Sequence, residues 1–551
     1  MDATVRRERT VALGRSGAGT ALPSLVQRLR PPVRGSSRVW GWVGPLGVTL
    51  IAGIFRLWRL GEPRLVLFDE TYYAKDAWSL LKYGYVREFT ESANDKVVAG
   101  RLRGIFKPEV TEIVHPDGGK WLIAAGEHFF GLTPFGWRIS AAVAGTLTVL
   151  VLCRLVRRMT GSTLLGCVAG LLLATDGLHL VVSRLALLDV FVGFWLVCAA
   201  ACLVADRDWA RVRFARAADR GVAGWGPVRG LLLRPWRVAA GACFGAACGT
   251  KWSGLYALAA FALLSWLWDV RARRALGVRV AWLRSALVDG VPAFLSVVGV
   301  ALGVYLTTWA GFFRHRSVYE DRFGHGYGED PAWGAYLDHP ATSWPGTWAD
   351  SLRSLWHYHQ MVYRFHTGDY LASQTHPYGS NPRGWLFLNR PVGIDAQLDL
   401  APTTPGCTAA PDDTCLRQVL ALGNPALWWI GAAALLLCVV LVVVRRDWRY
   451  TVPLLAVAVG WLPWLRFDDR PIFLFYAAAF VPFTAMAVAL VLGWVLGPPG
   501  TDRSRRRLGV GVVLLVLGLQ LVAFAYFWPI WTDQLITHSQ WLERMWFDAW
   551  V

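Results

Sequence analysis

Long apolar segments recur along this chain and set its hydropathy pattern. A helix needs roughly 17 to 25 mostly apolar residues to cross the hydrocarbon core of a bilayer. We predict eleven spans, at residues 40–57, 139–156, 164–182, 185–204, 238–249, 252–268, 285–309, 425–444, 451–465, 472–496 and 508–528. The pattern therefore predicts an all-α polytopic membrane protein with about eleven transmembrane helices and two long loops, at residues 58–137 and 310–424.

The weakest part of this prediction is the pair at residues 238–249 and 252–268, because Lys251 interrupts the apolar run. Two short helices or one kinked excursion each explain the pattern. If the pair is a single span, every later loop changes sides.

Basic residues mark one side of the membrane. Arginine and lysine in short loops stay cytoplasmic. With eleven spans, the basic stretch before the first span and the Arg-rich loops near residues 154–158, 207–237, 271–284, 445–449 and 503–507 all fall on the same side, whereas the two long loops are balanced or slightly acidic. This arrangement predicts a cell-membrane protein with a cytoplasmic N-terminus and an extracytoplasmic C-terminus.

Composition supports a membrane protein, and the membrane topology explains most of the net positive charge. The 551 residues are 55% hydrophobic and 17% charged, against roughly 25% charged in soluble domains. The 31 Trp fit membrane interfaces. The net charge, 56 basic minus 38 acidic residues or +18, is mainly a topology signal, so we predict no nucleic-acid site. Residues 1–38 are expected to be a basic disordered cytoplasmic tail without a cleavable signal peptide, and residues 39–551 one transmembrane domain.

Nine cysteines are present, and seven of them lie in or beside apolar spans, where packing is the default role. The other two, Cys407 and Cys415, lie in the second long loop within CTAAPDDTC. An outer location is oxidising, which favours a structural disulfide between them.

The first long loop opens with an acidic pair, Asp69 and Glu70, in RLVLFDETYYAKDAW. On spacing alone a helix N-cap is the commoner role, because acids satisfy the free N–H groups of a first turn. Catalysis is the alternative, since a carboxylate near a low-dielectric surface can be tuned to accept a proton from a hydroxyl.

Several charged residues lie beside or within the spans on the same outer face. His115 and Lys120, in HPDGGK, could orient a phosphate or simply form a turn before an interfacial helix. Further charges at or within the spans, which are costly there and suggest function, are Arg138, Arg184, Asp189, Lys251 and Arg470. Snorkelling of a long side chain toward water is the structural alternative for the cations. Their convergence on one face favours a site.

The second long loop carries seven histidines, at positions 315, 325, 339, 357, 359, 366 and 376. His357 and His359 are two residues apart and would share a face only in a strand. No cysteine or acid cluster joins them at zinc spacing, so we favour aromatic packing over a metal site.

Several motifs, in a shared order, resemble the protein O-mannosyltransferase family in its bacterial, actinobacterial form. They are FDETYYAKDAW (68–78), HPDGGKWLI (115–123), WRISAAVAG (137–145), SRLALLDVF (183–191), TKWSGLY (250–256), HPYGSNPRGWLFLNRPVG (376–393) and QVLALGNPALWWIGA (418–432). The resemblance covers nearly all of the chain except the basic tail. It implies the GT-C glycosyltransferase fold with eleven spans.

The resemblance also implies roles for individual residues. Asp69 and Glu70 match the family's acidic pair, with Asp69 as the base toward the acceptor hydroxyl and Glu70 positioning the peptide, although the two roles could be exchanged. Arg138 matches an essential arginine, and His115 and Lys120 match an HPP-x-GK element. Arg470 is the candidate for binding the lipid phosphate, and Lys251 is the second.

Two features depart from the family pattern. Asp117 replaces the second proline of the HPP element. The loop at 310–424 is too short for the β-trefoil MIR domain of eukaryotic members, which fits the bacterial branch.

The expected reaction is transfer of mannose, with inversion, from polyprenyl-phosphate-mannose to Ser or Thr hydroxyls of secreted or membrane proteins at the outer face. We expect no metal and no cofactor, because cations could take up the charge of the leaving phosphate. A related GT-C transferase that moves another lipid-linked sugar to lipid or polysaccharide is the main alternative, and a transporter fits less well. Docking on the secretion translocon and the oligomeric state are left open by the sequence.

Overall fold

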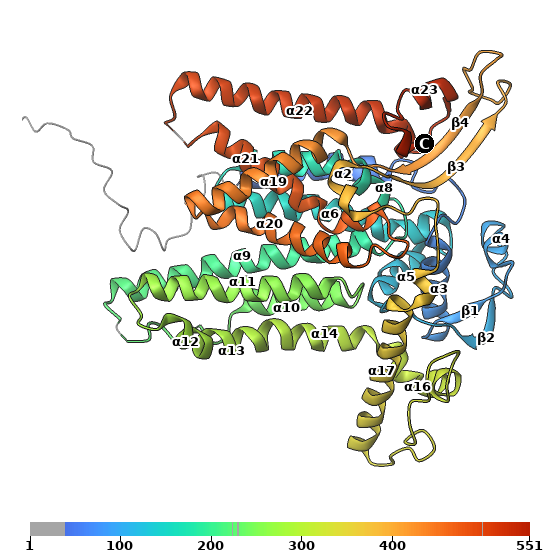
Figure 1. Ribbon diagram of the computed structural model, residues 1–551, viewed down its shortest axis with the longest axis horizontal. Coiled ribbons are helices and arrows are strands. Elements are labelled where there is room, and N and C mark those ends of the chain that lie inside the picture. The colour runs from blue at the N-terminus through green and yellow to red at the C-terminus, as the bar shows by residue number, and fades with distance from the viewer. Residues whose placement is uncertain (1–38, 223, 229–230, 499) are drawn as a thin grey trace, which may run out of the picture.

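The computed structural model describes residues 39–222, 224–228, 231–498 and 500–551, so the expected tail at 1–38 lies outside the described residues. Long helices run roughly alongside one another, and small sheets and short helices gather at one end of them (Figure 1). We call this the outer end, because it is built from the two long loops predicted to be extracytoplasmic.

The first group of long helices packs around α6 (Pro134–Thr160). This helix contacts α2 (Trp40–Leu57), α7 (Thr163–Ala174) and α9 (Asp189–Asp219). It ends at Gly161, whose φ of 76° suits glycine, and the side chain of Ser162 then accepts a hydrogen bond at the start of α7. The short helix α8 (Gly177–Val182) lies between α7 and α9.

The next helices are α10 (Pro235–Cys248) and α11 (Gly254–Ala275), followed by a long helical segment, residues 281–308. This segment comprises α12 (Ala281–Ser285), the π-helical turn η1 (Ala286–Gly290), α13 (Val291–Ala293), the π-helical turn η2 (Phe294–Gly299) and α14 (Val300–Thr308). Close packing explains Gly245 in α10, because an added Cβ would lie 2.5 Å from the carbonyl oxygen of Ala301. The structure thus has two separate helices on either side of Lys251.

The last long helices are α19 (Pro425–Arg445), α20 (Trp448–Trp461), α21 (Val481–Leu496) and α22 (Arg503–Trp531). Helix α21 packs against α19, α20, α22 and α7, which joins the two halves of the chain in one core. The 3-10 turns η5 (Leu462–Arg466) and η6 (Leu474–Ala479) connect α20 to α21.

All eleven predicted spans contain helix. Within the described residues, seven helices are long and apolar enough to cross a membrane, and three shorter apolar helices accompany them. The predicted span at 164–182 is divided into α7 and α8 at Thr175 and Asp176. The all-α membrane architecture is confirmed, whereas the count of eleven crossings stays a prediction.

The outer end contains two small sheets. Strands β1 (Arg87–Phe89) and β2 (Phe106–Val110) pair antiparallel, and a second antiparallel sheet has the order β3–β4–β5, from β3 (Val392–Leu400), β4 (Cys415–Ala421) and β5 (Ile536–Thr537). The predicted disulfide between Cys407 and Cys415 is present in the β3–β4 hairpin.

Short helices complete the outer end. The first long loop contributes α3 (Glu70–Tyr83), α4 (Ala93–Val98) and α5 (Gly118–Phe130). The second contributes α15 (Ala310–Arg314), α16 (Arg316–Tyr319), η3 (Glu320–Gly324), α17 (Trp344–Thr367), α18 (Asp369–Ala372) and η4 (Pro382–Phe387). Beyond α22, α23 (His538–Leu542) and η7 (Asp548–Trp550) bring the C-terminus to this end (Figure 1).

Candidate active site

Asp69 occupies the N-cap position of α3, as the cap interpretation of the acidic pair requires, but its side chain makes no capping hydrogen bond. Its carboxylate instead accepts a hydrogen bond from Tyr73, one turn along the helix. The preceding residue, Phe68, has a φ of 47°, which is strained for a bulky side chain. The Phe68 ring packs edge-on against Phe473 and Phe475, which hold this unusual turn in place.

Glu70 is fully buried and fully bonded. Arg138 of α6 donates to it twice, Nε to Oε1 at 2.8 Å and Nη2 to Oε2 at 2.9 Å. The backbone N–H groups of Leu67 and Ala186 donate to the remaining positions, each at 3.0 Å. Such a paired, fully hydrogen-bonded carboxylate links three segments of the chain, and both of its oxygens are already occupied by donors.

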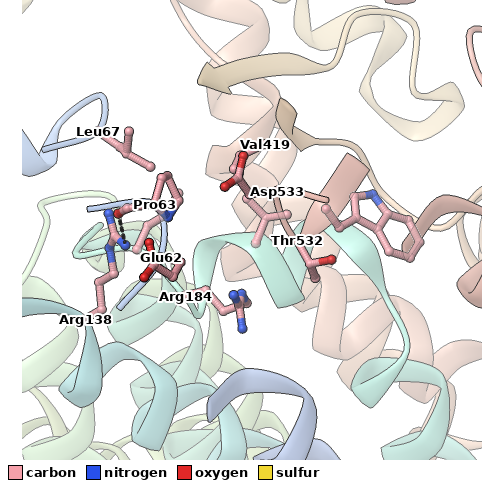
Figure 2. A pocket seen from close by; sticks show the side chains of 11 residues that line it. Glu62, Pro63, Leu67, Arg138, Arg184, Val419, Thr532 and Asp533 are labelled. Atoms are coloured by element: carbon pink, nitrogen blue, oxygen red, sulfur yellow. Dashed lines mark hydrogen bonds between the residues drawn. The ribbon is translucent and has the colours of Figure 1, made fainter. Parts of the chain in front are cut away.

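Arg138 and Arg184 also donate hydrogen bonds to backbone carbonyl groups near this ion pair. Arg138 also donates to the carbonyl oxygens of Pro63 and Leu65, each at 3.0 Å. Arg184, between α8 and α9, donates to carbonyl oxygens at the end of α2. Both line a small pocket with Glu62 and Asp533, shown in Figure 2. Two acids face the two cations there, so the pocket has no net excess of positive charge.

Lys251 lies between the acids of the site. Its Nζ is 3.0 Å from Oδ1 and 3.2 Å from Oδ2 of Asp189, at the start of α9. It also lies over the ring of Tyr476, 4.0 Å from the centroid. The break between α10 and α11 therefore places this lysine at the outer end of both helices, beside α9 and η6.

The surroundings of Asp69 tune it toward proton exchange. Partial burial raises the pKa of Asp69 to about 6, although the nearby Lys251 charge and the Tyr73 hydrogen bond oppose the rise. The negative charge of Asp189 acts in the same direction as burial. A carboxylate with this pKa is mostly ionised at neutral pH and can still accept a proton.

A layer of histidines and arginine faces Lys251. His115 stacks on His366 of α17 with ring centroids 5.4 Å apart, and the Nη1 of Arg470 donates to the carbonyl oxygen of His366 at 3.0 Å. Burial and then the charge of Lys251 hold the pKa of His115 well below its usual range. Burial likewise lowers the pKa of His366 to about 4. Both rings are thus neutral at physiological pH beside two cations.

Lys120 is turned away from this layer into a buried acidic pair. Its Nζ lies 3.0 Å from Oδ2 of Asp76 and 3.4 Å from Oδ1 of Asp117. Asp117, the residue that departs from the family's second proline, is completely buried and its pKa is raised to about 6 by burial. The departure therefore supplies a partner for Lys120 in this structure.

A small, mostly apolar pocket adjoins the site. Asp189 and Tyr476 line it together with Val192, Leu196 and Val459. It lies between α9, α20, η5 and η6, and residues at the start of α11 complete its wall. Its volume of about 20 Å³ is close to that of one water molecule, so it forms an apolar lining beside Lys251 and is too small for a hydrocarbon chain.

Histidines of the second long loop pack against aromatic rings. No group of three or more His, Cys, Asp or Glu that could hold a metal ion is found within the part of the chain that the structure describes. His357 stacks between Trp333 and Tyr336, and His359 stacks on Trp252. The two lie on one helix, and their rings contact different neighbours.

The structure thus brings together Asp69, His115, Asp189, Lys251 and Arg470, and adds residues that the sequence reasoning did not select. Tyr73 and Tyr476 follow the singled-out Asp69 and Arg470 closely in sequence, and that proximity was the available signal. In the sequence, nothing distinguishes His366 from the other histidines of its loop, because no periodicity shows that it meets His115.

Comparison with known proteins gives matches over most of the chain. A family model described as dolichyl-phosphate-mannose-protein mannosyltransferase matches residues 47–298. A second, for the C-terminal four-transmembrane region of protein O-mannosyltransferase, matches residues 351–550.

Individual relatives match with similar coverage. Polyprenol-phosphate-mannose–protein mannosyltransferase of Mycobacterium tuberculosis is 37% identical over 93% of this chain and 92% of the relative. The protein of the same name from Corynebacterium glutamicum is 32% identical over 91% of each chain. The S. cerevisiae protein O-mannosyltransferase Pmt1-Pmt2 complex bound to the sugar donor has a chain that matches with a TM-score of 0.65 at 14% identity, covering 94% of this chain and 93% of that one. That last likeness concerns the fold.

Proposed function

Because the chain belongs to the dolichyl-phosphate-mannose-protein mannosyltransferase family, we propose that it transfers mannose from polyprenyl-phosphate-mannose to Ser or Thr hydroxyls of proteins. The family that the motifs predicted is confirmed, as are the GT-C fold and the membrane glycosyltransferase class. The site supports this function because it joins a carboxylate of raised pKa and two cations beside an apolar lining at one end of a membrane helix bundle.

We propose that the reaction takes place at the extracytoplasmic face of the cell membrane. Basic loops lie at the end of the bundle opposite the site, where positive residues stay cytoplasmic. The acceptor is then a secreted or membrane protein segment that has crossed the bilayer, and the secretion translocon is the natural supplier of such segments. The N-terminus is cytoplasmic and the C-terminus extracytoplasmic in this arrangement.

Asp69 is the base of the proposed reaction. Its carboxylate accepts the proton of the acceptor hydroxyl while the hydroxyl oxygen forms a bond to the anomeric carbon of mannose. The bond from that carbon to the phosphate oxygen breaks, and the electron pair leaves with the polyprenyl phosphate. Attack from the face opposite the phosphate inverts the configuration at the anomeric carbon.

The donor phosphate is placed between Lys251 and Arg470. Cations near a leaving phosphate stabilise the charge that develops on it, which is the role a metal has in other transferases. Among the described residues, the buried Nε of Arg470 has no hydrogen-bond partner, so this guanidinium has donor capacity left.

Glu70, Arg138 and Arg184 are assigned positioning roles around this centre. The Glu70–Arg138 pair fixes the start of α3 against α6 and the loop before α9, and so sets the position of Asp69. His115 lines the donor side through its contact with His366. Lys120 supports the same turn through Asp76 and Asp117.

The observation that carries the assignment of the base is the contrast between two adjacent acids: Glu70 is saturated by Arg138, whereas Asp69 has a raised pKa and faces Lys251. The test is transfer of radiolabelled mannose from polyprenyl-phosphate-mannose to a Ser/Thr-rich peptide in membranes. Asp69→Asn should lower kcat by at least about 100-fold with little change in melting temperature.

Glu70→Gln is the matched control. It leaves Arg138 without its buried charge partner, so it should destabilise the fold by about 3–5 kcal/mol and lower the melting temperature. Equal transfer by wild type and Asp69→Asn would remove Asp69 from the role of base. Label appearing in lipid or polysaccharide instead of the peptide would favour the alternative acceptor class.

A further inference from the structure

Helix α17 (Trp344–Thr367) carries a row of large exposed side chains. Trp344, Trp348, Leu352 and Trp356 recur every four residues, and Tyr363 continues the row two turns later. Their exposed fractions are 76%, 45%, 46%, 64% and 60%. Each step of four residues turns by about 40° around the helix, so the row winds gradually along one side. Between Trp356 and Tyr363 that side carries His359, which stacks on Trp252, so the exposed surface is interrupted there. We call these five residues the aromatic stripe.

The stripe is one of three different sides of this helix. The buried side, with Leu355, Tyr358 and Val362, packs on the aromatic core beneath the outer loop. At about 100° per residue, Arg353 and Arg364 fall on a third side, next around the helix from the stripe. A helix anchored by protein on one side, apolar on the second and cationic on the third matches the boundary between lipid and water.

The direction of α17 agrees with that interpretation. The helix runs across the direction of the long helices at the outer end, and it extends past α14 and beyond the bundle (Figure 1). Short helix α16 lies on its far side, away from the bundle. The overhanging part of α17 therefore lies at the level where the membrane surface surrounds α14.

We propose that α17 is a membrane-surface helix whose aromatic stripe inserts between the headgroups and acyl chains of the outer leaflet. Tryptophan and tyrosine favour this depth because each combines a large apolar ring with a polar N–H or O–H group. Arg353 and Arg364 are exposed and are ion-paired with Asp350 and Asp330, so the third side of the helix would face water.

The same helix reaches the candidate active site. His359 stacks on Trp252, the neighbour of Lys251, at a centroid distance of 5.3 Å. Arg470 donates a hydrogen bond to the carbonyl oxygen of His366, and its Nη1 also lies beside the His366 ring. If the donor binds as proposed above, lipid contact along the stripe sets the depth of these groups relative to the polyprenyl phosphate. The lipid contact itself stands independently of the reaction.

The experiment measures depth at neighbouring positions on different sides of α17. Leu352→Cys and Trp356→Cys place a thiol in the stripe, and Arg353→Cys is the matched control on the cationic side, where 62% of the side chain is exposed. Each full-length protein is labelled with a nitrobenzoxadiazole fluorophore in phosphatidylcholine vesicles. Wild type is treated identically, because the seven native free cysteines lie in α6, α7, α9, α10 and α19.

Quenching by lipids that carry a nitroxide near the headgroup reports insertion, and quenching by iodide reports exposure to water. Labels at positions 352 and 356 should be quenched by the lipid nitroxide, and iodide quenching should be on the order of threefold weaker there than at position 353. Equal iodide quenching at all three positions would overturn the proposal. Loss of lipid quenching, together with a disulfide between copies of the unlabelled Leu352→Cys protein, would overturn it in favour of a protein partner.

Discussion

The positive charge of Lys251 acts on several other groups of the site. It pairs with Asp189, lies over the Tyr476 ring and lowers the pKa of Asp69 against the effect of burial. In the proposed reaction it has two tasks, because the charge that keeps Asp69 ionised also faces the leaving phosphate. The two tasks can be tested separately, since only the first of them changes the pKa of Asp69.

The pH profile of kcat/KM should show the first task. The base must be ionised, so the rate should rise with pH through a value of about 6 and fall away below it. Lys251→Met removes the positive charge and leaves the Asp189 charge unpaired, and both changes raise the pKa of Asp69. The acid limb should therefore move to higher pH by about one unit, whereas Lys251→Arg, which keeps the charge, should leave the limb near its wild-type position. An unmoved limb in Lys251→Met would show that a different group titrates.

At the scale of elements, the structure shows how far local sequence decides where helices end. The predicted first span and α2 share the bounds Trp40–Leu57, since an apolar run alone defines them. The predicted span at 164–182 breaks at Asp176, whose carboxylate accepts hydrogen bonds from the backbone of Asn424 and the indole of Trp428, each at 2.9 Å. Those partners are about 250 residues away, so no local pattern could reveal the break.

The candidate site was predictable to a similar extent. Adjacent acids outside the first span, and cations placed beside spans, are visible in a sequence because charge is costly there. Which charge meets which is a tertiary property: Glu70 pairs with Arg138, 68 positions away, and Lys251 pairs with Asp189. Asp69 and Glu70 are equivalent in the pattern, and only these pairings distinguish them.

Arg184 offers a test of how elements are held together around the site. Its guanidinium donates to carbonyl oxygens of Phe55, Arg56 and Trp58, where α2 ends and its last carbonyls lack helical partners. Arg184→Ala should lose charged hydrogen bonds worth about 1.5–3 kcal/mol and lower the melting temperature of the purified protein.

Its effect on donor binding should be small. The KM for polyprenyl-phosphate-mannose should stay near the wild-type value in the protein that remains folded, because Arg184 faces backbone and the pocket of Figure 2. Arg184→Lys, which keeps one charged donor, should recover part of the melting temperature. A raised KM with an unchanged melting temperature would instead make Arg184 a donor-binding residue.

At the scale of the whole molecule, the arrangement of charge and the arrangement of the site agree. The reactive groups, both sheets, the disulfide and α17 all lie at one end of the bundle, and the Arg-rich connections lie at the other. The proposed acceptor, a protein segment that has crossed the membrane, and an oxidising surrounding for Cys407–Cys415 would both require the first end to face outward. Orientation is therefore the premise on which the proposed acceptor depends.

Labelling of single introduced cysteines by a membrane-impermeant maleimide measures that orientation in intact cells. Glu91→Cys, before α10, and Arg383→Cys, after α14, both lie at exposed positions of the two outer loops, and Arg505→Cys lies at the exposed start of α22. With α10 and α11 as two separate spans, the first two positions should be labelled from outside, and Arg505→Cys only after permeabilisation. Labelling at Glu91→Cys combined with protection at Arg383→Cys would mean that residues 238–268 cross the membrane once. The second outer loop, with Arg470 and α17, would then lie on the wrong side for Asp69, and the proposed site could not form.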